Sequence, residues 1–116
     1  MHPHDAPLTP TDFHVLLVLA GESLYGYAIL KAVEEESEGL VAPEIGSLYR
    51  VLARLLDGGL VHEVDPPTEA PTTHRGRPRR YYALTEAGRA VLLAETTRLS
   101  GALEIARARL RARPTG

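Results

Sequence analysis

Residues Arg75-Gly-Arg-Pro-Arg-Arg-Tyr-Tyr-Ala-Leu-Thr-Glu-Ala-Gly-Arg89 join an arginine-rich loop to a short aromatic strand and then to the start of a helix. The stretch contains five arginines, and no acidic residue precedes Glu86 in it. Guanidinium groups gathered in this way are typical of a surface that contacts phosphate. The segment upstream strengthens this interpretation.

The segment upstream, residues 45–61, predicts a helix that is followed directly by a strand. Five apolar residues recur at helical spacing and are expected to face the core: Ile45, Leu48, Leu52, Leu55 and Leu56. The opposite face is short, polar and basic, and it carries Ser47, Arg50 and Arg54. An ordinary amphipathic helix with solvated arginines would show the same face, so the helix alone does not decide the function.

A hairpin with a long loop is expected after this helix. Gly58-Gly59 ends the helix, and residues 60–64 alternate in polarity as a strand does. Residues 65–78 contain four prolines and predict a loop, after which residues 79–84 return as the second strand. A loop of about 14 residues is unusually long for a hairpin and favours a functional wing.

Two further helices are expected in the first part of the chain. Thr9 can cap a helix that has proline at its first position and runs to about residue 20. Four of its residues are predicted to face the core: Phe13, Leu16, Leu17 and Ala20. The second helix is predicted from Leu24 to Ser37, with three residues buried: Tyr27, Ala28 and Val33.

The last helix is expected to begin after the capping residue Thr85 and to continue to about residue 113. A coiled-coil-like seam runs along it at alternating spacings of four and three: Leu92, Thr96, Leu99, Leu103, Ala106 and Leu110. Nothing else in so short a chain could cover the distal half of this seam. We therefore predict a homodimer that is held together by Leu92, Leu99, Leu103, Ala106 and Leu110. Gly101 weakens the helix by about 1 kcal/mol relative to alanine, and it either allows two helices to approach closely or marks a bend.

The order of these elements predicts a mainly α fold with a small β-hairpin wing, which is a winged helix-turn-helix with a C-terminal dimerisation helix. We expect the DNA-binding domain to span residues 1–84, with its hairpin at about 60–84. The dimerisation helix, residues 85–116, belongs to the same compact unit.

In this fold the third helix enters the major groove of double-stranded DNA, and the wing reaches the flanking backbone. The predicted DNA-binding residues are Ser47, Tyr49, Arg50, Arg54, Arg75, Arg77, Arg79 and Arg80. Ser47 and Tyr49 can donate to phosphate, whereas Arg50 and Arg54 can reach base edges or the backbone. The wing arginines are expected to add salt-dependent affinity without sequence preference.

The charge of the chain is distributed unevenly. The net charge is −2, but residues 1–70 hold 3 basic and 12 acidic residues, whereas residues 71–116 hold 10 arginines and 3 glutamates. The basic charge can therefore meet DNA only locally. The acidic first part keeps two alternatives open: a winged-helix module that binds an acidic protein partner without sequence-specific DNA binding, and an architectural DNA binder without an operator.

Other classes of function find little support in the residues. The chain has no cysteine, and its five histidines are spread over different elements, so we expect neither a metal site nor a cofactor. No nucleophile–base grouping or phosphate-binding glycine loop is present, so we expect no enzyme activity and no catalytic residues. The longest apolar run has six residues, and the first residues do not read as a secretory signal. We expect a cytoplasmic protein that associates with the nucleoid.

The chain resembles the PadR family of bacterial transcriptional regulators along nearly its whole length. The matching motifs are, in order, Leu8-Thr-Pro-Thr-Asp-Phe13, Leu24-Tyr-Gly-Tyr-Ala-Ile29, Gly46-Ser-Leu-Tyr-Arg50, Gly58-Gly-Leu-Val61 and Arg79-Arg-Tyr-Tyr-Ala-Leu-Thr-Glu-Ala-Gly-Arg89. Each is short, but their order and spacing together are specific. The single C-terminal helix is similar to that of the short subfamily. Two features depart from the family pattern: Tyr25 stands where members commonly carry histidine, and the wing is long and rich in proline.

The resemblance implies a dimeric winged-helix repressor. We therefore expect a homodimer that binds a pseudo-palindromic operator, with two recognition helices in successive major grooves roughly 34 Å apart. A small apolar or aromatic effector could release the DNA by shifting the population of dimer conformations. The candidate effector pocket is lined by Phe13, Leu17, Leu92 and Leu99, for which plain core packing is the alternative.

Overall fold

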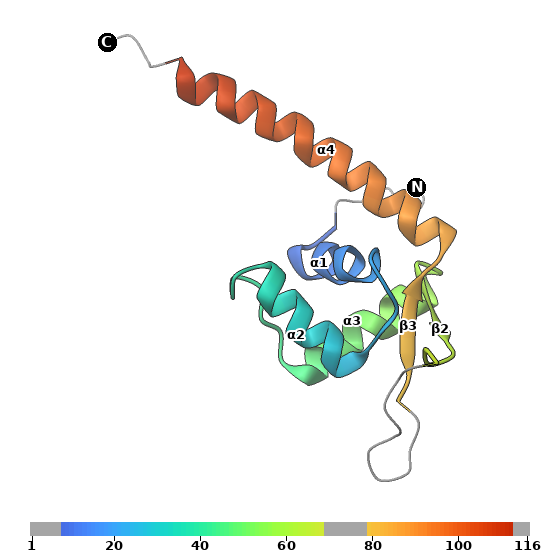
Figure 1. Cartoon of the computed structure of the whole chain (residues 1–116). Coiled ribbons are helices and arrows are strands. Elements are labelled where there is room, and N and C mark those ends of the chain that lie inside the picture. Colours follow the sequence, from blue (N-terminus) through green and yellow to red (C-terminus); the bar gives the residue numbers. More distant parts are fainter. Residues whose placement is uncertain (1–7, 69–78, 113–116) are drawn as a thin grey trace.

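The computed structural model describes residues 8–68 and 79–112. The helices and strands follow one another as α1 (Pro10–Leu19), β1 (Leu24–Tyr25), α2 (Gly26–Glu36), α3 (Ile45–Asp57), β2 (Val61–Val64), β3 (Tyr81–Leu84) and α4 (Glu86–Arg111). In Figure 1, α1, α2 and α3 form a compact group beside a small sheet, and α4 projects away from this group. The predicted winged helix-turn-helix with a C-terminal helix is confirmed.

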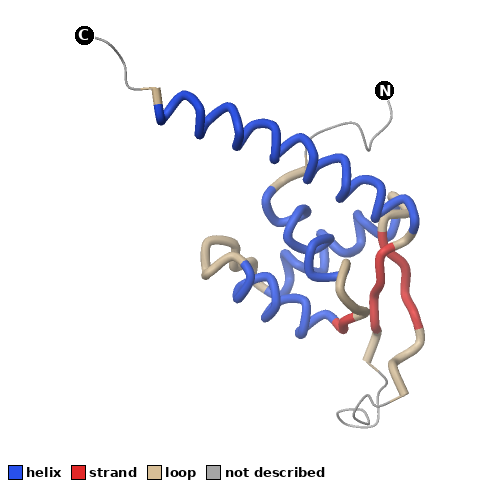
Figure 2. The backbone as a smooth tube through the Cα atoms, turned by 45° about the horizontal axis from the view of Figure 1, so that its top comes forward, coloured by secondary structure: helices blue, strands red, loops and turns tan. Residues whose placement is uncertain are grey.

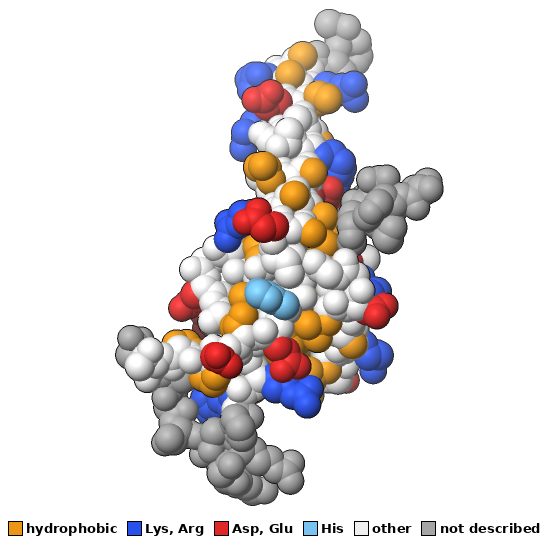
Figure 3. Space-filling view, turned by 90° about the vertical axis from the view of Figure 1, so that its right-hand side faces the viewer, with side chains coloured by type: hydrophobic (Ala, Val, Ile, Leu, Met, Phe, Trp, Pro, Cys, Tyr) orange, Lys and Arg blue, Asp and Glu red, His pale blue; other side chains and the backbone are white. Residues whose placement is uncertain are grey.

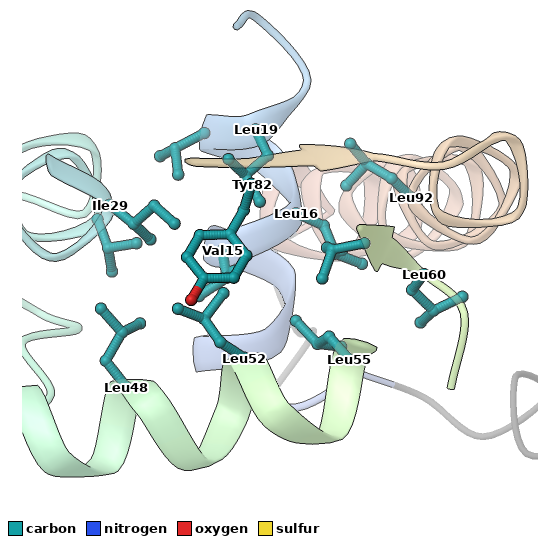
Figure 4. Close-up of a cluster of buried hydrophobic side chains, with 13 residues drawn as sticks. Val15, Leu16, Leu19, Ile29, Leu48, Leu52, Leu55, Leu60, Tyr82 and Leu92 are labelled. Atoms are coloured by element: carbon teal, nitrogen blue, oxygen red, sulfur yellow. The ribbon is translucent and has the colours of Figure 1, made fainter. Parts of the chain in front are cut away.

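The core lies where the first three helices meet the sheet (Figure 4). Its fully buried side chains are Val15, Leu16, Ile29, Val33, Leu48, Leu52 and Val61. The predicted core residues Leu48, Leu52 and Leu55 of α3 are buried, but Ile45 is 43% exposed at the first position of the helix, and Leu56 is half-buried.

The predicted core faces of α1 and α2 need correction. Leu17 is 36% exposed, whereas Val15, Val18 and Leu19 are buried beside Leu16. Because α1 contacts both α2 and α4, it is buried on two sides, and a run of consecutive apolar residues does not reveal which sides these are. Phe13 and Ala20 are half-buried.

On α2, Ile29 is buried beside the predicted Val33, whereas Tyr27 is 55% exposed and Ala28 is half-buried. The second helix also begins later than expected, because Leu24 and Tyr25 form strand β1. This strand pairs antiparallel with β3, as β2 does, so that the sheet has the order β1-β3-β2 (Figure 2). Two residues are too few to show the alternating polarity of a strand, so the sequence does not predict one here. Leu24 and Tyr25 form a strand because they pair with β3. The short strand places Tyr25 and the start of α2 beside Tyr81, at the end of the two hairpin strands that joins the wing loop; we call this end the base of the hairpin.

The junction between the hairpin and α4 is built tightly. Gly59 adopts a positive φ of 74° after the end of α3, and Leu60 N donates to Leu55 O, as in a Schellman motif. Thr85 Oγ1 accepts from Gly88 N, which confirms the predicted cap, and it also donates to Gly59 O at 2.6 Å. A Cβ atom on Gly88 would collide with the carbonyl oxygen of Leu60. Only glycine at position 88 lets the first turn of α4 lie this close to the hairpin.

Helix α4 has 26 residues and ends at Arg111, close to the expected end. Of the predicted seam, Leu92 is buried and Leu99 half-buried against the rest of the chain, whereas every described residue from Ser100 onward is exposed. Figure 3 shows hydrophobic side chains among charged ones along this projecting part. No described helix is both long and apolar enough to cross a membrane.

Candidate nucleic-acid interface

The outer face of the third helix carries three of the predicted DNA-binding residues together. Ser47, Tyr49 and Arg50 lie within one turn of α3, and the Tyr49 side chain is 48% exposed. Arg50 is exposed, and its Nη2 atom donates to Ser47 Oγ at 3.0 Å. Solvent reaches this hydrogen bond, so the Arg50 guanidinium can exchange it for a contact to a nucleic acid.

Arg54, one turn further on, has a different environment. Its guanidinium forms two parallel hydrogen bonds to the Asp12 carboxylate, Nη1 to Oδ2 at 3.0 Å and Nη2 to Oδ1 at 2.7 Å. The Asp12 side chain is only 6% exposed, and its hydrogen bond raises the pKa of Arg54 above its ordinary value. Arg54 thus joins α3 to the first turn of α1. The one acidic residue in the sequence of α1, Asp12, was the only sign of this pair in the sequence.

The base of the hairpin holds the other two described candidates. The Arg79 guanidinium lies over the Tyr25 ring, 4.2 Å from its centroid, and Tyr25 packs edge-on against Tyr81 at 5.6 Å. Arg80 approaches Glu63 at 3.7 Å, but both side chains are largely exposed, so this pair is weak. Arg75 and Arg77, with most of the predicted wing loop, lie outside the described residues.

An open hollow of about 800 Å³ lies between α3 and the base of the hairpin. We call it the tyrosine–arginine hollow; it is lined by Tyr25, Gly26, Tyr27, Tyr49, Arg79, Arg80 and Tyr82. Tyr82 is 3% exposed, and burial raises the pKa of its hydroxyl above the ordinary value. The sequence analysis did not identify Tyr25, Gly26, Tyr27 or Tyr82 as site residues.

Gly26 brings two elements of this hollow together. A Cβ atom on Gly26 would collide with the Tyr49 hydroxyl group, so glycine lets the first turn of α2 approach the outer face of α3. A glycine in the first turn of α2 was the visible sign of the close approach in the sequence. The exposed glutamates at 34–36 lie at the other end of α2, away from the hollow.

A second hollow, of about 390 Å³, lies between α1 and α4. Its lining residues are Leu8, Pro10, Phe13, His14, Glu95, Arg98 and Leu99. Of the four predicted pocket residues, Phe13 and Leu99 line it, whereas Leu17 is exposed on α1 and Leu92 belongs to the core.

The polar part of this second hollow is an ion pair that the sequence analysis did not identify. Glu95 is 7% exposed, accepts two hydrogen bonds of 2.9 Å from Arg98, and also accepts one from Leu8 N. The hydrogen bonds from Arg98 lower the pKa of the Glu95 carboxyl. Among the described residues, no group of three or more histidine, aspartate or glutamate side chains is placed to hold a metal ion.

Comparison with known proteins gives a consistent result. The profile of the transcriptional regulator PadR-like family matches residues 15–94. A PadR family transcription regulator from Clostridium difficile R20291 superposes with a TM-score of 0.71 at 24% identity, covering 88% of this chain and 99% of that one. A PadR-like regulator from Bacillus cereus gives a TM-score of 0.70 at 20% identity, covering 88% and 92%. At such identities these likenesses establish the fold.

This chain covers a smaller share of two further relatives. Bacillus subtilis PadR, solved in complex with operator DNA, has a TM-score of 0.60 at 22% identity over 72% of this chain and 44% of that one. An uncharacterized 37.1 kDa protein in transposon TN4556 of Streptomyces fradiae is 42% identical over 90 residues. That match covers 75% of this chain but 23% of the relative, so the chain spans less than a quarter of that protein's length.

Proposed function

This chain belongs to the PadR-like family of transcriptional regulators, and we propose that it represses transcription as a homodimer bound to a pseudo-palindromic operator. One observation carries the proposal: the exposed face of α3 and the basic base of the hairpin border the same hollow on one side of the molecule. A helix beside a basic hairpin is the geometry in which a winged helix reads a major groove and contacts the adjacent backbone. The complex of Bacillus subtilis PadR with operator DNA supports this use of the fold.

The contacts of each arginine suggest separate roles. We assign base reading to Arg50, which is exposed, and backbone contacts to Ser47 and Tyr49 beside it. Arg79 and Arg80 would contact the backbone from the base of the hairpin, with Arg75 and Arg77 extending this contact. Arg54 instead serves as an anchor of α3, because the buried Asp12 carboxylate already occupies its guanidinium.

The projecting part of α4 supports the proposed homodimer. Leu103 and Ile105 are each 53% exposed, and Leu110 is 81% exposed. A helix that leaves the domain and carries large apolar side chains is stable in water chiefly when a second surface covers it. A two-fold partner would cover it and would place two copies of α3 for successive major grooves, roughly 34 Å apart.

The hollow between α1 and α4 supports release by a small effector. Its volume is within the range of small-ligand sites, and the apolar part of its lining, which includes Leu8, Phe13 and Leu99, suits an apolar or aromatic molecule. Phe13 on its wall is the neighbour of Asp12, which holds Arg54 of the recognition helix. A ligand that binds one dimer conformation better than the other would change operator affinity through this contact. A repressor of this kind acts at the bacterial nucleoid, in the cytoplasm.

Selection of bound duplexes from a random-sequence library, with the mass of the protein measured in solution, tests the proposal. We expect an enriched inverted repeat and a dimeric mass. Binding without enrichment would contradict operator recognition and favour an architectural DNA binder. A complete lack of DNA binding would overturn the proposal and favour the protein-interaction module.

A further inference from the structure

The tyrosine–arginine hollow has the composition of an anion site. Its lining contains two guanidinium groups and four tyrosines, and among the residues that the structure describes none of the lining residues is acidic. Guanidinium and hydroxyl groups donate hydrogen bonds to oxyanions, and a lining without carboxylates offers nothing to a metal cation. The chemistry of the walls therefore favours phosphate.

The guanidinium of Arg79 is held in place before any ligand arrives. It lies 4.2 Å from the centroid of the Tyr25 ring, and Tyr25 is itself packed edge-on against Tyr81. Stacking on an aromatic face fixes the plane of a guanidinium while leaving its N–H groups, which lie in that plane, able to donate. In the described part of the chain, Arg79 forms no ion pair with a carboxylate.

Hydroxyl donors and a helix start surround this cation. Tyr49 reaches the hollow from α3, and its hydroxyl group packs over Gly26 at the start of α2. The residue before this helix, Tyr25, makes no side-chain cap, so the positive end of the helix dipole is not neutralised by a capping group. Tyr82, almost fully buried, adds a hydroxyl from the floor of the hollow.

The position of the hollow indicates which kind of phosphate it binds. One wall belongs to the face of α3 that we assign to the major groove, and the other belongs to the base of the hairpin that flanks it. The backbone of a duplex passes between these two elements when a winged helix binds. A hollow that opens broadly to solvent suits a phosphate that remains part of a long chain.

We propose that the tyrosine–arginine hollow seats one phosphodiester of the operator backbone in each half-site, with Arg79 as its main cation and Tyr25 as the residue that positions Arg79. The inference rests on the proposed function, which assigns Arg79 to the DNA backbone, and deepens it by naming the hollow that takes one phosphate and the residue that positions this arginine. In this proposal Tyr25 does not itself contact DNA. Its ring acts on the phosphate through Arg79, which is stacked on it.

Single neutral methylphosphonate substitutions, placed in turn along the selected operator, test the inference. With the wild-type protein, one position in each half-site should weaken binding on the order of tenfold, which is the effect of losing a charge-assisted contact. In Arg79→Ala, a methylphosphonate at the same operator position should weaken binding less than about twofold, because the guanidinium that contacts this phosphate is absent. The slope of log affinity against log salt should fall by about one for each protomer.

Two Tyr25 variants separate positioning from direct contact. Tyr25→Phe keeps the ring and should retain the tenfold effect at the same operator position. Tyr25→Leu removes the stacked ring and should reduce both affinity and the effect of that position about threefold. The matched control is Arg111→Ala, at the end of α4 that lies far from the hairpin in Figure 1, and it should behave as wild type.

The outcomes distinguish this inference from the proposed function. If the wild-type protein selects no sequence, the proposed function fails first. If it selects an operator but no position depends on Arg79, the seat for a phosphodiester is refuted. The inference is also overturned if inorganic phosphate, at matched ionic strength, raises the melting temperature of wild type and not of Arg79→Ala while no operator position depends on Arg79, because the hollow then takes a free anion.

Discussion

The proposed DNA-binding side of the molecule and the distal half of α4 differ in how far their side chains are packed against other residues of the same chain. Around the tyrosine–arginine hollow, side chains already hold one another: Arg79 stacks on Tyr25, and Tyr49 packs on Gly26. From Ser100 onward every described residue of α4 is exposed, including large apolar ones. A surface that is ordered by its own chain can meet a rigid polymer without rearrangement, whereas a bare apolar helix needs a second protein surface. The difference fits the proposal that a single chain forms the DNA-binding surface, while pairing of two chains sets the spacing of the recognition helices.

The largest effect is expected at Gly88, where the two regions are joined. Gly88→Ala places a Cβ against the Leu60 carbonyl oxygen, so the start of α4 must move away from the hairpin. We expect a loss of about 3 kcal/mol or more in the free energy of unfolding, measured by urea denaturation. Ala87→Gly, at the exposed neighbouring position, is the control and should cost about 1 kcal/mol. A Gly88→Ala protein as stable as wild type would show that the junction is not tight.

The next effect falls on the distal half of α4. Leu103→Asp should convert the dimer to a monomer and weaken operator binding about a hundredfold, because the two half-sites are then bound independently. Its unfolding in urea should not depend on protein concentration, whereas unfolding of a wild-type dimer should, because a partner subunit stabilises the folded chain by mass action. Mass in solution and operator titration check both points. A dimer that persists in Leu103→Asp would move the interface to another surface.

Removal of the anchor between α1 and α3 should have a moderate effect. Breaking a buried ion pair costs about 3–5 kcal/mol, but the Arg54 side chain is 57% exposed and solvent screens it, so we expect roughly 1–2 kcal/mol for Arg54→Ala. The double variant Asp12→Ala/Arg54→Ala should recover part of this loss, because no buried carboxylate is left alone. Arg50→Ala is the control and should change stability by less than about 0.5 kcal/mol. Equal stabilities of Arg54→Ala and Arg50→Ala would argue against the anchor.

Gly101 sharpens the comparison, because its surroundings are open in the single chain. If the partner helix also leaves space there, Gly101→Ala should stabilise the protein by about 1 kcal/mol through helix propensity alone. Thermal unfolding of the dimer measures this. A destabilised or monomeric Gly101→Ala protein would instead show that two helices cross closely at this glycine.

The smallest effect concerns the ion pair beside the second hollow. Because Arg98 lowers the pKa of Glu95 in the folded protein, this carboxylate contributes stability above its unfolded pKa of about 4.3, and the contribution is lost as pH falls through the lower folded value. Stability measured between about pH 5 and pH 3 should therefore fall less steeply in Glu95→Gln than in wild type. Identical slopes would show that Glu95 contributes nothing to acid unfolding.

The predictable and unpredictable parts of the molecule follow from the range of the interactions involved. Capping by Thr85, the break at Gly58-Gly59 and the buried leucines of α3 depend on neighbours close in sequence, and the structure confirms them. Strand β1 depends on a partner more than forty residues away, and so do the contacts of Arg54 with Asp12 and of Tyr25 with Arg79. Periodicity carries no information about such pairs.

The candidate site shows the same division. Composition and helical spacing placed Ser47 and Arg50 on the face opposite the core, and in the structure Arg50 is exposed and Ser47 half-buried. They also placed Arg54 there, but they could not show that a carboxylate from α1 occupies its guanidinium. The tyrosine–arginine hollow could not be predicted from the sequence, because its walls come from three segments that only the fold brings together.

Arg50 provides the most direct test of the central claim, that the exposed face of α3 reads the operator. Wild type and Arg50→Ala are titrated at the same salt concentration against the selected operator and against a scrambled duplex of equal composition. We predict that Arg50→Ala loses about ten- to a hundredfold in affinity for the operator and less than about threefold for the scrambled duplex. An equal loss on both duplexes would contradict the claim, because Arg50 would then contact only the backbone.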